Sequence, residues 1–162
     1  MLIDYPMCPS SQLNLSLTRT LQEVEVLYVT FGFSNVGTSP CSLFGYPGFQ
    51  PLSADGQPIP SEVVRTNSPG STFVGKLTGG VTATPQFTVV NPGQTVYFQV
   101  AYSNVCSGSG ASGGLCASAN SIQVWPPNQR TPLSVALQGS ATQFADQAAP
   151  IRIDVSPVYP TQ

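Results

Sequence analysis

Few residue types in this chain could perform chemistry. It contains seven acidic residues, four cysteines and no histidine, so serine or cysteine nucleophiles activated by histidine are excluded. Glu23 and Glu25 stand two residues apart, about 7 Å on one strand face at roughly 3.3 Å per residue, which is a separation that inverting glycosidases use. A solvated strand end explains this pair without any chemistry. We therefore expect no enzymatic activity and no catalytic residue.

The four cysteines indicate disulfides rather than a metal site. Cys8, Cys41, Cys106 and Cys116 are separated by 33, 65 and 10 residues, whereas zinc sites use closely spaced cysteines or histidine partners. Disulfides imply an oxidising compartment. Of the three possible pairings we favour Cys8 with Cys41 and Cys106 with Cys116, because a flexible Gly/Ser-rich loop separates the last two. No metal and no other cofactor is expected.

Aromatic residues gather at two proline-rich places. Phe44, Tyr46 and Phe49 follow Cys41 within a short apolar segment, and Trp125 precedes Pro126-Pro127. Such residues either pack in a corner of the fold or form an exposed patch that contacts a partner. If a partner surface exists, these four aromatic residues are our candidates for it.

The elements that position these residues are predicted to be strands. Sixteen prolines and fifteen glycines are spread along the chain, so few stretches could form a helix. Alternating apolar and polar residues recur instead. Hairpin turns are expected at Asp55-Gly56, which is the tightest hairpin signal in the sequence, and at Asn91-Pro92-Gly93. The clearest expected strands cover residues 13–18, 23–34, 58–66, 87–90, 95–103, 122–125, 133–137 and 151–155.

These strands predict one all-β domain over residues 1–162, with segment 1–10 tied down by Cys8. Eight to ten short strands without crossover helices favour an antiparallel, immunoglobulin-like β-sandwich with Greek-key connections. The only tryptophan, Trp125, follows all four cysteines, so the cysteine–tryptophan–cysteine core of antibody domains is not expected.

Composition narrows the possible partners and the compartment. Charged residues make up only 7% of the chain and the net charge is −2, so a cationic surface for nucleic acid is excluded. No apolar run approaches the roughly 18 residues of a membrane span, and the first residues lack a signal peptide pattern. Low charge and paired cysteines favour an exported protein whose signal or anchor segment is not in this chain. No small-molecule ligand is indicated.

Six short motifs are distributed along the chain: Phe33-Ser34-Asn35, Cys41-Ser42-Leu43-Phe44-Gly45-Tyr46-Pro47-Gly48, Asp55-Gly56, Asn91-Pro92-Gly93, Val124-Trp125-Pro126-Pro127 and Val155-Ser156-Pro157-Val158. Together they resemble a family of exported actinobacterial domains of unassigned function, often found in lipoproteins or on membrane-anchored proteins. The resemblance implies an extracytoplasmic β-sandwich and supplies no catalytic residues. The family commonly has a cysteine shortly before its last strand, where this chain has Phe144-Ala145-Asp146-Gln147, so the partner of Cys116 stays open.

The sequence thus predicts a non-enzymatic interaction module, secreted or on the cell surface, that binds a protein partner or itself. The alternative is a structural subunit of an extracellular filament or coat, assembled through strand exchange or sheet edges. Asn14 lies in the only N-glycosylation sequon, Asn14-Leu15-Ser16, and would point outward from a strand. Neither the partner nor the state of assembly follows from the sequence.

Overall fold

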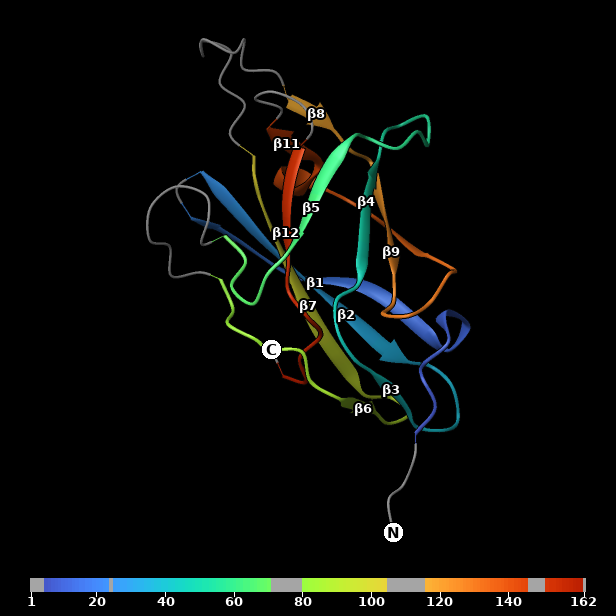
Figure 1. Ribbon diagram of the computed structural model, residues 1–162. Coiled ribbons are helices and arrows are strands. Elements are labelled where there is room, and N and C mark those ends of the chain that lie inside the picture. The colour runs from blue at the N-terminus through green and yellow to red at the C-terminus, as the bar shows by residue number, and fades with distance from the viewer. Residues whose placement is uncertain (1–4, 24, 71–79, 105–115, 146–150, 162) are drawn as a thin grey trace.

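Figure 1 shows the computed structural model of the chain, which describes residues 5–23, 25–70, 80–104, 116–145 and 151–161. This described part contains twelve strands and two short 3-10 helices, η1 (Ser10–Gln12) and η2 (Gly139–Thr142), and no α-helix. The predicted all-β class is confirmed. More strands are present than the eight to ten predicted, because three unpredicted strands are only three residues long and too short to show an alternation: Cys41–Leu43, Cys116–Ser118 and Gln143–Ala145. No helix in these residues is long and apolar enough to cross a membrane.

The largest sheet has five strands in the order β1-β2-β7-β12-β5. Most neighbours are antiparallel, but β12 runs parallel to β5, which corrects the expectation of purely antiparallel pairing. The position of β5 at an edge agrees with the prolines that precede it, because proline cannot donate to a strand ladder. The five strands are β1 (Leu13–Glu23), β2 (Val26–Asn35), β7 (Thr95–Ser103), β12 (Ile151–Val155) and β5 (Ser61–Arg65).

A three-stranded antiparallel sheet and two short strand pairs complete the fold. The three-stranded sheet has the order β10-β9-β4, and the short antiparallel pairs are β3 with β6 and β8 with β11. Their bounds are β3 (Cys41–Leu43), β4 (Gly48–Leu52), β6 (Thr88–Val90), β8 (Cys116–Ser118), β9 (Ser121–Trp125), β10 (Leu133–Ala136) and β11 (Gln143–Ala145).

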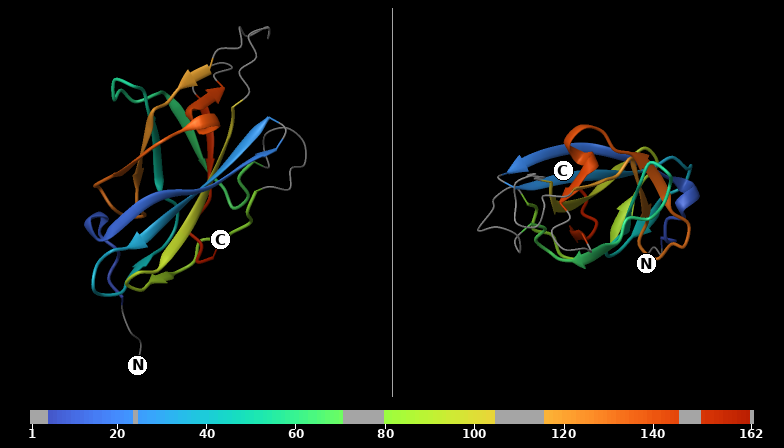
Figure 2. Two further views of the ribbon diagram at one scale, coloured as in Figure 1. Left: turned by 180° about the vertical axis from the view of Figure 1, so that it is seen from behind. Right: turned by 90° about the horizontal axis from the view of Figure 1, so that it is seen from above.

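The core lies between the five-stranded and the three-stranded sheet. Phe31 of β2 stacks on Phe98 of β7 at 5.3 Å between ring centroids and meets Phe49 of β4 at 5.8 Å. Figure 2 shows β4, β9 and β10 on one side of β1, β2 and β7. Burying each phenylalanine contributes roughly 1.5–3 kcal/mol. This arrangement is consistent with a β-sandwich, and the immunoglobulin-like Greek-key order stays a prediction.

The predicted strand over residues 23–34 is confirmed as β2 with its alternation, but β2 begins at Val26 rather than at Glu23. Leu27 and Phe33 belong to the main core, whereas Tyr28 is buried on the opposite face. The chain reverses inside the predicted strand: β1 ends at Glu23, which pairs with Val26 at the start of β2. No glycine, proline, asparagine or aspartate marks this reversal, and the apolar alternation runs on through it.

The predicted hairpin between residues 87–90 and 95–103 is wrong. The turn itself exists, because the Gln94 N–H donates to the Asn91 carbonyl at 2.9 Å and Gly93 has φ +82°. However, β6 pairs with β3 and β7 pairs with β2. Asn35 separates the two strands: its backbone bonds to Gly93 and Gln94, and its side chain donates to the Val90 carbonyl at 2.8 Å.

The N-terminal segment is fastened to β3, as predicted. Cys8 forms a disulfide with Cys41 across a Cα–Cα distance of 4.9 Å. Two backbone hydrogen bonds flank it, from Cys8 to the Ser42 carbonyl at 2.9 Å and from Ser42 to the Pro6 carbonyl at 2.8 Å. Both cysteines are fully buried. Segment 6–8 is therefore part of the folded body.

Candidate functional site

The bend after β3 presents the aromatic residues that the sequence singled out. Its backbone is held from two directions, by the disulfide of Cys41 and by a 2.9 Å hydrogen bond from the Val158 N–H to the Gly45 carbonyl. Gly45 has φ +103°, a conformation that residues with a Cβ rarely adopt. The bend is therefore fixed, and it leaves Phe44 52% exposed.

A surface pocket of about 290 Å³ opens beside this bend. We call it the aromatic corner. It is built from four stretches of chain that are distant in sequence, because residues 44–46 meet the end of β5, the segment before β6 and the turn after β9. Its lining residues are Phe44, Gly45, Tyr46, Arg65, Pro85, Pro127 and Asn128.

Tyr46 and Arg65 give the aromatic corner its polarity. The Tyr46 hydroxyl hydrogen-bonds to the Asn67 side chain at 2.7 Å, and the guanidinium of Arg65 lies 5.9 Å from the centre of the Tyr46 ring. An arginine over a tyrosine face is an attractive pair that keeps the cation in place and accessible. The pocket offers aromatic faces, proline rings and one positive charge. Its lining holds no acidic residue and no serine, threonine or cysteine.

The other two aromatic candidates lie elsewhere. Phe49 is only 5% exposed and belongs to the core, so it is not available to a partner. Trp125 is half-buried in β9 and pairs with Gly48, where a Cβ on the glycine would lie 3.3 Å from the indole ring. Trp125 therefore packs against the backbone next to the aromatic corner without lining it. Only Phe44 and Tyr46 are brought together at one site.

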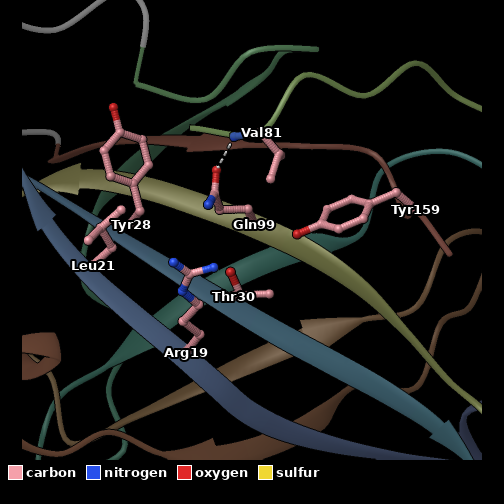
Figure 3. A pocket seen from close by; sticks show the side chains of 7 residues that line it. All are labelled: Arg19, Leu21, Tyr28, Thr30, Val81, Gln99 and Tyr159. Carbon is pink, nitrogen blue, oxygen red and sulfur yellow. Dashed lines mark hydrogen bonds between the residues drawn. The ribbon is translucent and has the colours of Figure 1, made fainter. Parts of the chain in front are cut away.

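A second pocket lies on the outer face of the five-stranded sheet. We call it the sheet pocket. It measures about 60 Å³, and Figure 3 shows its side chains converging from β1, β2, β7 and two loop segments. Thr30 and Gln99 are buried at 4% and 5% exposure, whereas Arg19 is exposed. The lining residues are Arg19, Leu21, Tyr28, Thr30, Val81, Gln99 and Tyr159.

Two tyrosines of the sheet pocket have raised pKa values. Burial raises the pKa of Tyr159 above 10.0, and nearby Tyr97 adds to this, whereas a hydrogen bond with Thr30 and the guanidinium of Arg19 oppose it. Burial also raises the pKa of Tyr28, with smaller contributions from carboxylates. Both hydroxyls therefore stay protonated at neutral pH. The Tyr159 hydroxyl is hydrogen-bonded with Thr30, whereas the buried Tyr28 hydroxyl has no hydrogen-bond partner among the described residues.

Comparison with known protein families identifies the chain. One family, described as a domain of unknown function (DUF4232), matches residues 8–159. The chain belongs to this family. No curated protein and no solved structure matches it. The DUF4232 match runs from the disulfide-bonded Cys8 to Tyr159 of the sheet pocket, so both pockets fall within it.

The remaining candidates of this DUF4232 chain have different outcomes. The disulfide between Cys8 and Cys41 is confirmed, whereas Cys106 lies outside the described residues and its pairing with Cys116 stays a prediction. Glu23 ends β1 and Glu25 follows it in the connection to β2, so the two do not share a strand face. Within the described residues, no three acidic, cysteine or histidine side chains gather where they could hold a metal ion.

Sequence reasoning missed most of the residues that build both pockets. Arg65, Asn67 and Pro85 reach the aromatic corner through long-range packing that no local motif encodes. In the sheet pocket, Thr30 and Gln99 had only one signal, a polar position between apolar neighbours of a strand. That signal is identical to that of a solvent-facing residue.

Proposed function

We propose that this domain is an extracytoplasmic, non-enzymatic interaction module that binds a protein partner at the aromatic corner. One observation carries the proposal: Phe44 is 52% exposed beside a fixed Tyr46–Arg65 pair. Large apolar side chains are usually buried, and aromatic residues and arginine are the types that protein interfaces favour at their centres.

The extracytoplasmic part of the proposal rests on the cysteines and the charge. The Cys8–Cys41 disulfide is stable in oxidising compartments and rare in the cytosol. A charge content of 7%, against about 25% in an ordinary soluble domain, suits a protein outside the cell. The likeness to exported actinobacterial domains points the same way.

The geometry of the aromatic corner favours a partner that presents proline or aliphatic side chains. Proline rings stack well on tyrosine and phenylalanine, and grooves lined with aromatic residues recognise extended proline-rich segments. Arg65 adds a donor for a carbonyl or a carboxylate of the bound segment. The partner is therefore expected to be an extended segment rather than a flat domain surface.

Site-specific photocrosslinking tests the proposal. A benzophenone amino acid replaces Phe44, and in a matched control it replaces Phe87, which is equally exposed at 57% and does not line the corner. After illumination in the envelope fraction of the source cells, Phe44 should yield one discrete adduct, which Arg65→Gln weakens, and Phe87 should yield none. Equal labelling from both positions would contradict the proposal.

The same experiment separates the two modes of association. An adduct at twice the 17.0 kDa mass of the chain would be a second copy of this chain. That result would favour the alternative, a subunit of an extracellular filament or coat. An adduct containing a different polypeptide would support the interaction module.

A further inference from the structure

The sheet pocket is rich in hydrogen-bond donors and has no acidic lining residue. Figure 3 shows the guanidinium of Arg19 and the hydroxyls of Thr30 and Tyr159 turned toward one common space. Arg19 forms no ion pair within the described residues, where the only salt bridge joins Arg152 to Asp154. Arg19 and Tyr159 therefore face a space whose lining holds no carboxylate, and the Thr30 hydroxyl beside them is hydrogen-bonded with Tyr159.

Gln99 adds a further donor whose orientation is fixed. Its Oε1 accepts a hydrogen bond from the Val81 N–H at 2.8 Å. Because the amide oxygen is bonded to the backbone of Val81, the amide nitrogen, which can only donate hydrogen bonds, points away from that backbone. Because Gln99 is 5% exposed, this nitrogen is held inside the pocket rather than at its rim.

Close packing keeps the Tyr28 end of the pocket rigid. A Cβ on Gly70 would collide with the Tyr28 hydroxyl, and a Cβ on Gly80 would collide with the Pro69 carbonyl oxygen. Gly70 also has φ +87°. Only glycines let these two stretches of chain approach the ring so closely, so the covering backbone is locked over Tyr28.

The size of the sheet pocket limits what can enter it. A site of roughly 10–15 Å³ by the same measure holds one water molecule, and this pocket offers about 60 Å³. A carboxylate fits that space, whereas a sugar ring or a nucleotide base does not. Arginine and hydroxyl donors match carboxylate oxygens in geometry and charge.

A larger and more open groove adjoins the sheet pocket. It has a volume of about 540 Å³ and shares Val81 and Tyr159 with the pocket. Its other lining residues are Thr82, Ala83, Thr84, Gln86, Pro160 and Thr161. A ligand whose carboxylate enters the sheet pocket would therefore have the rest of its length in this groove. The pocket by itself would hold a small anion, but the two together suit an elongated acid.

Backbone N–H groups of the groove wall alternate between hydrogen-bonded and unbonded positions, although residues 81–87 form no strand. The N–H groups of Val81 and Ala83 bond inward, to Gln99 at 2.8 Å and to the Asn67 carbonyl at 2.9 Å. The alternate residues Thr82 and Thr84 are exposed, and within the described residues their main chains make no hydrogen bond. An extended peptide could pair with these groups by adding a strand.

The geometry points to a second binding site: the sheet pocket and its groove bind an extended peptide through a carboxylate that Arg19, Gln99 and Tyr159 hold. The carboxylate belongs either to a C-terminus or to an acidic side chain. This site shares no lining residue with the aromatic corner, although Pro85 of the corner lies between Thr84 and Gln86 of the groove. Its test uses Arg19 rather than Phe44, so either proposal can fail alone.

Nuclear magnetic resonance titration of the ¹⁵N-labelled chain tests this inference. Three N-acetylated tripeptides serve as probes: trialanine with a free C-terminal carboxylate, the same peptide as its C-terminal amide, and an amidated peptide with a central glutamate. We expect a carboxylate probe to shift the side-chain amide resonance of Gln99. It should also bind about 10- to 150-fold more tightly than the amidated trialanine, which is the affinity ratio that corresponds to losing one charged hydrogen bond. Whichever carboxylate binds identifies its source.

Matched arginine variants complete the test. Arg19→Gln should abolish the preference for the carboxylate probe over the amide. The matched control is Arg130→Gln, because Arg130 is also exposed and lines none of the pockets described. This control variant should keep the preference. Three results would overturn the inference: no shift at millimolar peptide, equal affinity for acid and amide, or an equal loss in both variants. Unchanged amide spectra elsewhere in the sheet verify that each variant is folded.

Discussion

Replacing both Cys8 and Cys41 by alanine should destabilise the domain by about 4 kcal/mol. The bridge closes a loop over a sequence separation of 33 residues, and the loss of chain entropy on closing such a loop corresponds to about 3.7 kcal/mol at 25 °C. Both side chains are fully buried, so removing the sulfur atoms leaves a small cavity that adds to the cost. For a chain of this length the melting temperature should fall by about 8–16 °C.

The native state of this variant should remain intact. The backbone hydrogen bonds between segment 6–8 and Ser42 do not depend on the sulfur atoms, so most of the effect should arise in the unfolded chain. Two readouts express this: the denaturant slope m should increase because the unfolded chain expands, and hydrogen exchange at residues 6–8 should stay slow. Urea unfolding followed by circular dichroism gives the stability and the slope together.

Controls separate this bridge from the other two cysteines. In the double variant the remaining cysteines are Cys106 and Cys116, so added reductant changes the redox state of these two alone. The difference in unfolding free energy between wild type and variant under oxidising conditions therefore measures the contribution of the Cys8–Cys41 disulfide. A stability within about 1 kcal/mol of wild type would refute the loop-entropy argument. Rapid exchange at residues 6–8 would instead show that the bridge, not the backbone pairing, holds the segment.

Three further predictions concern buried aromatic residues. Tyr102→Phe removes a buried hydroxyl that donates to the Ala141 carbonyl at 2.8 Å, so urea unfolding should show a loss of about 1–3 kcal/mol, and an unchanged midpoint would contradict the bond. Phe31→Ala should lower the free energy of unfolding by about 3–5 kcal/mol. A smaller decrease would mean that the core collapses around the substituted site. Burial raises the pKa of Tyr28, Tyr102 and Tyr159 above 10.0, so the folded state holds protons that the unfolded chain releases above that pH. Stability should be constant up to about pH 10 and fall above it, which tyrosinate absorbance and circular dichroism can follow together, and an unfolding midpoint independent of alkaline pH would contradict this.

Local patterns in the sequence located most strands and their buried faces. Alternation identified the apolar face of β2 and the core side of β7 correctly, because one face of each strand must be apolar to pack. The pairing of Cys8 with Cys41 was also predictable from spacing and loop composition. The strand faces depend on residues that are close together in sequence, and the disulfide depends on cysteine chemistry that leaves one favoured pairing.

Features that depend on distant residues could not be predicted in this way. The parallel pair of β5 and β12 joins Ser61 to Ile151, and neither segment carries a mark of the other. The reversal between Glu23 and Val26 has no turn residue, since tertiary pairing with β7 overrides the local pattern. Both pockets are assembled from single residues of several elements, so their sequence signal is that of ordinary polar or aromatic positions.

The place of β12 in the largest sheet has a consequence for the order of folding. This strand fills the position between β7 and β5, yet it follows β5 by about ninety residues. During synthesis, β5 has no partner in its sheet until residues 151–155 emerge. Strands β1, β2 and β7 can pair before then, but the five-stranded sheet is completed only afterwards, because long-range strand pairs form after the loop between them. Until residues 151–155 arrive, the edge of β7 that β12 will cover stays open.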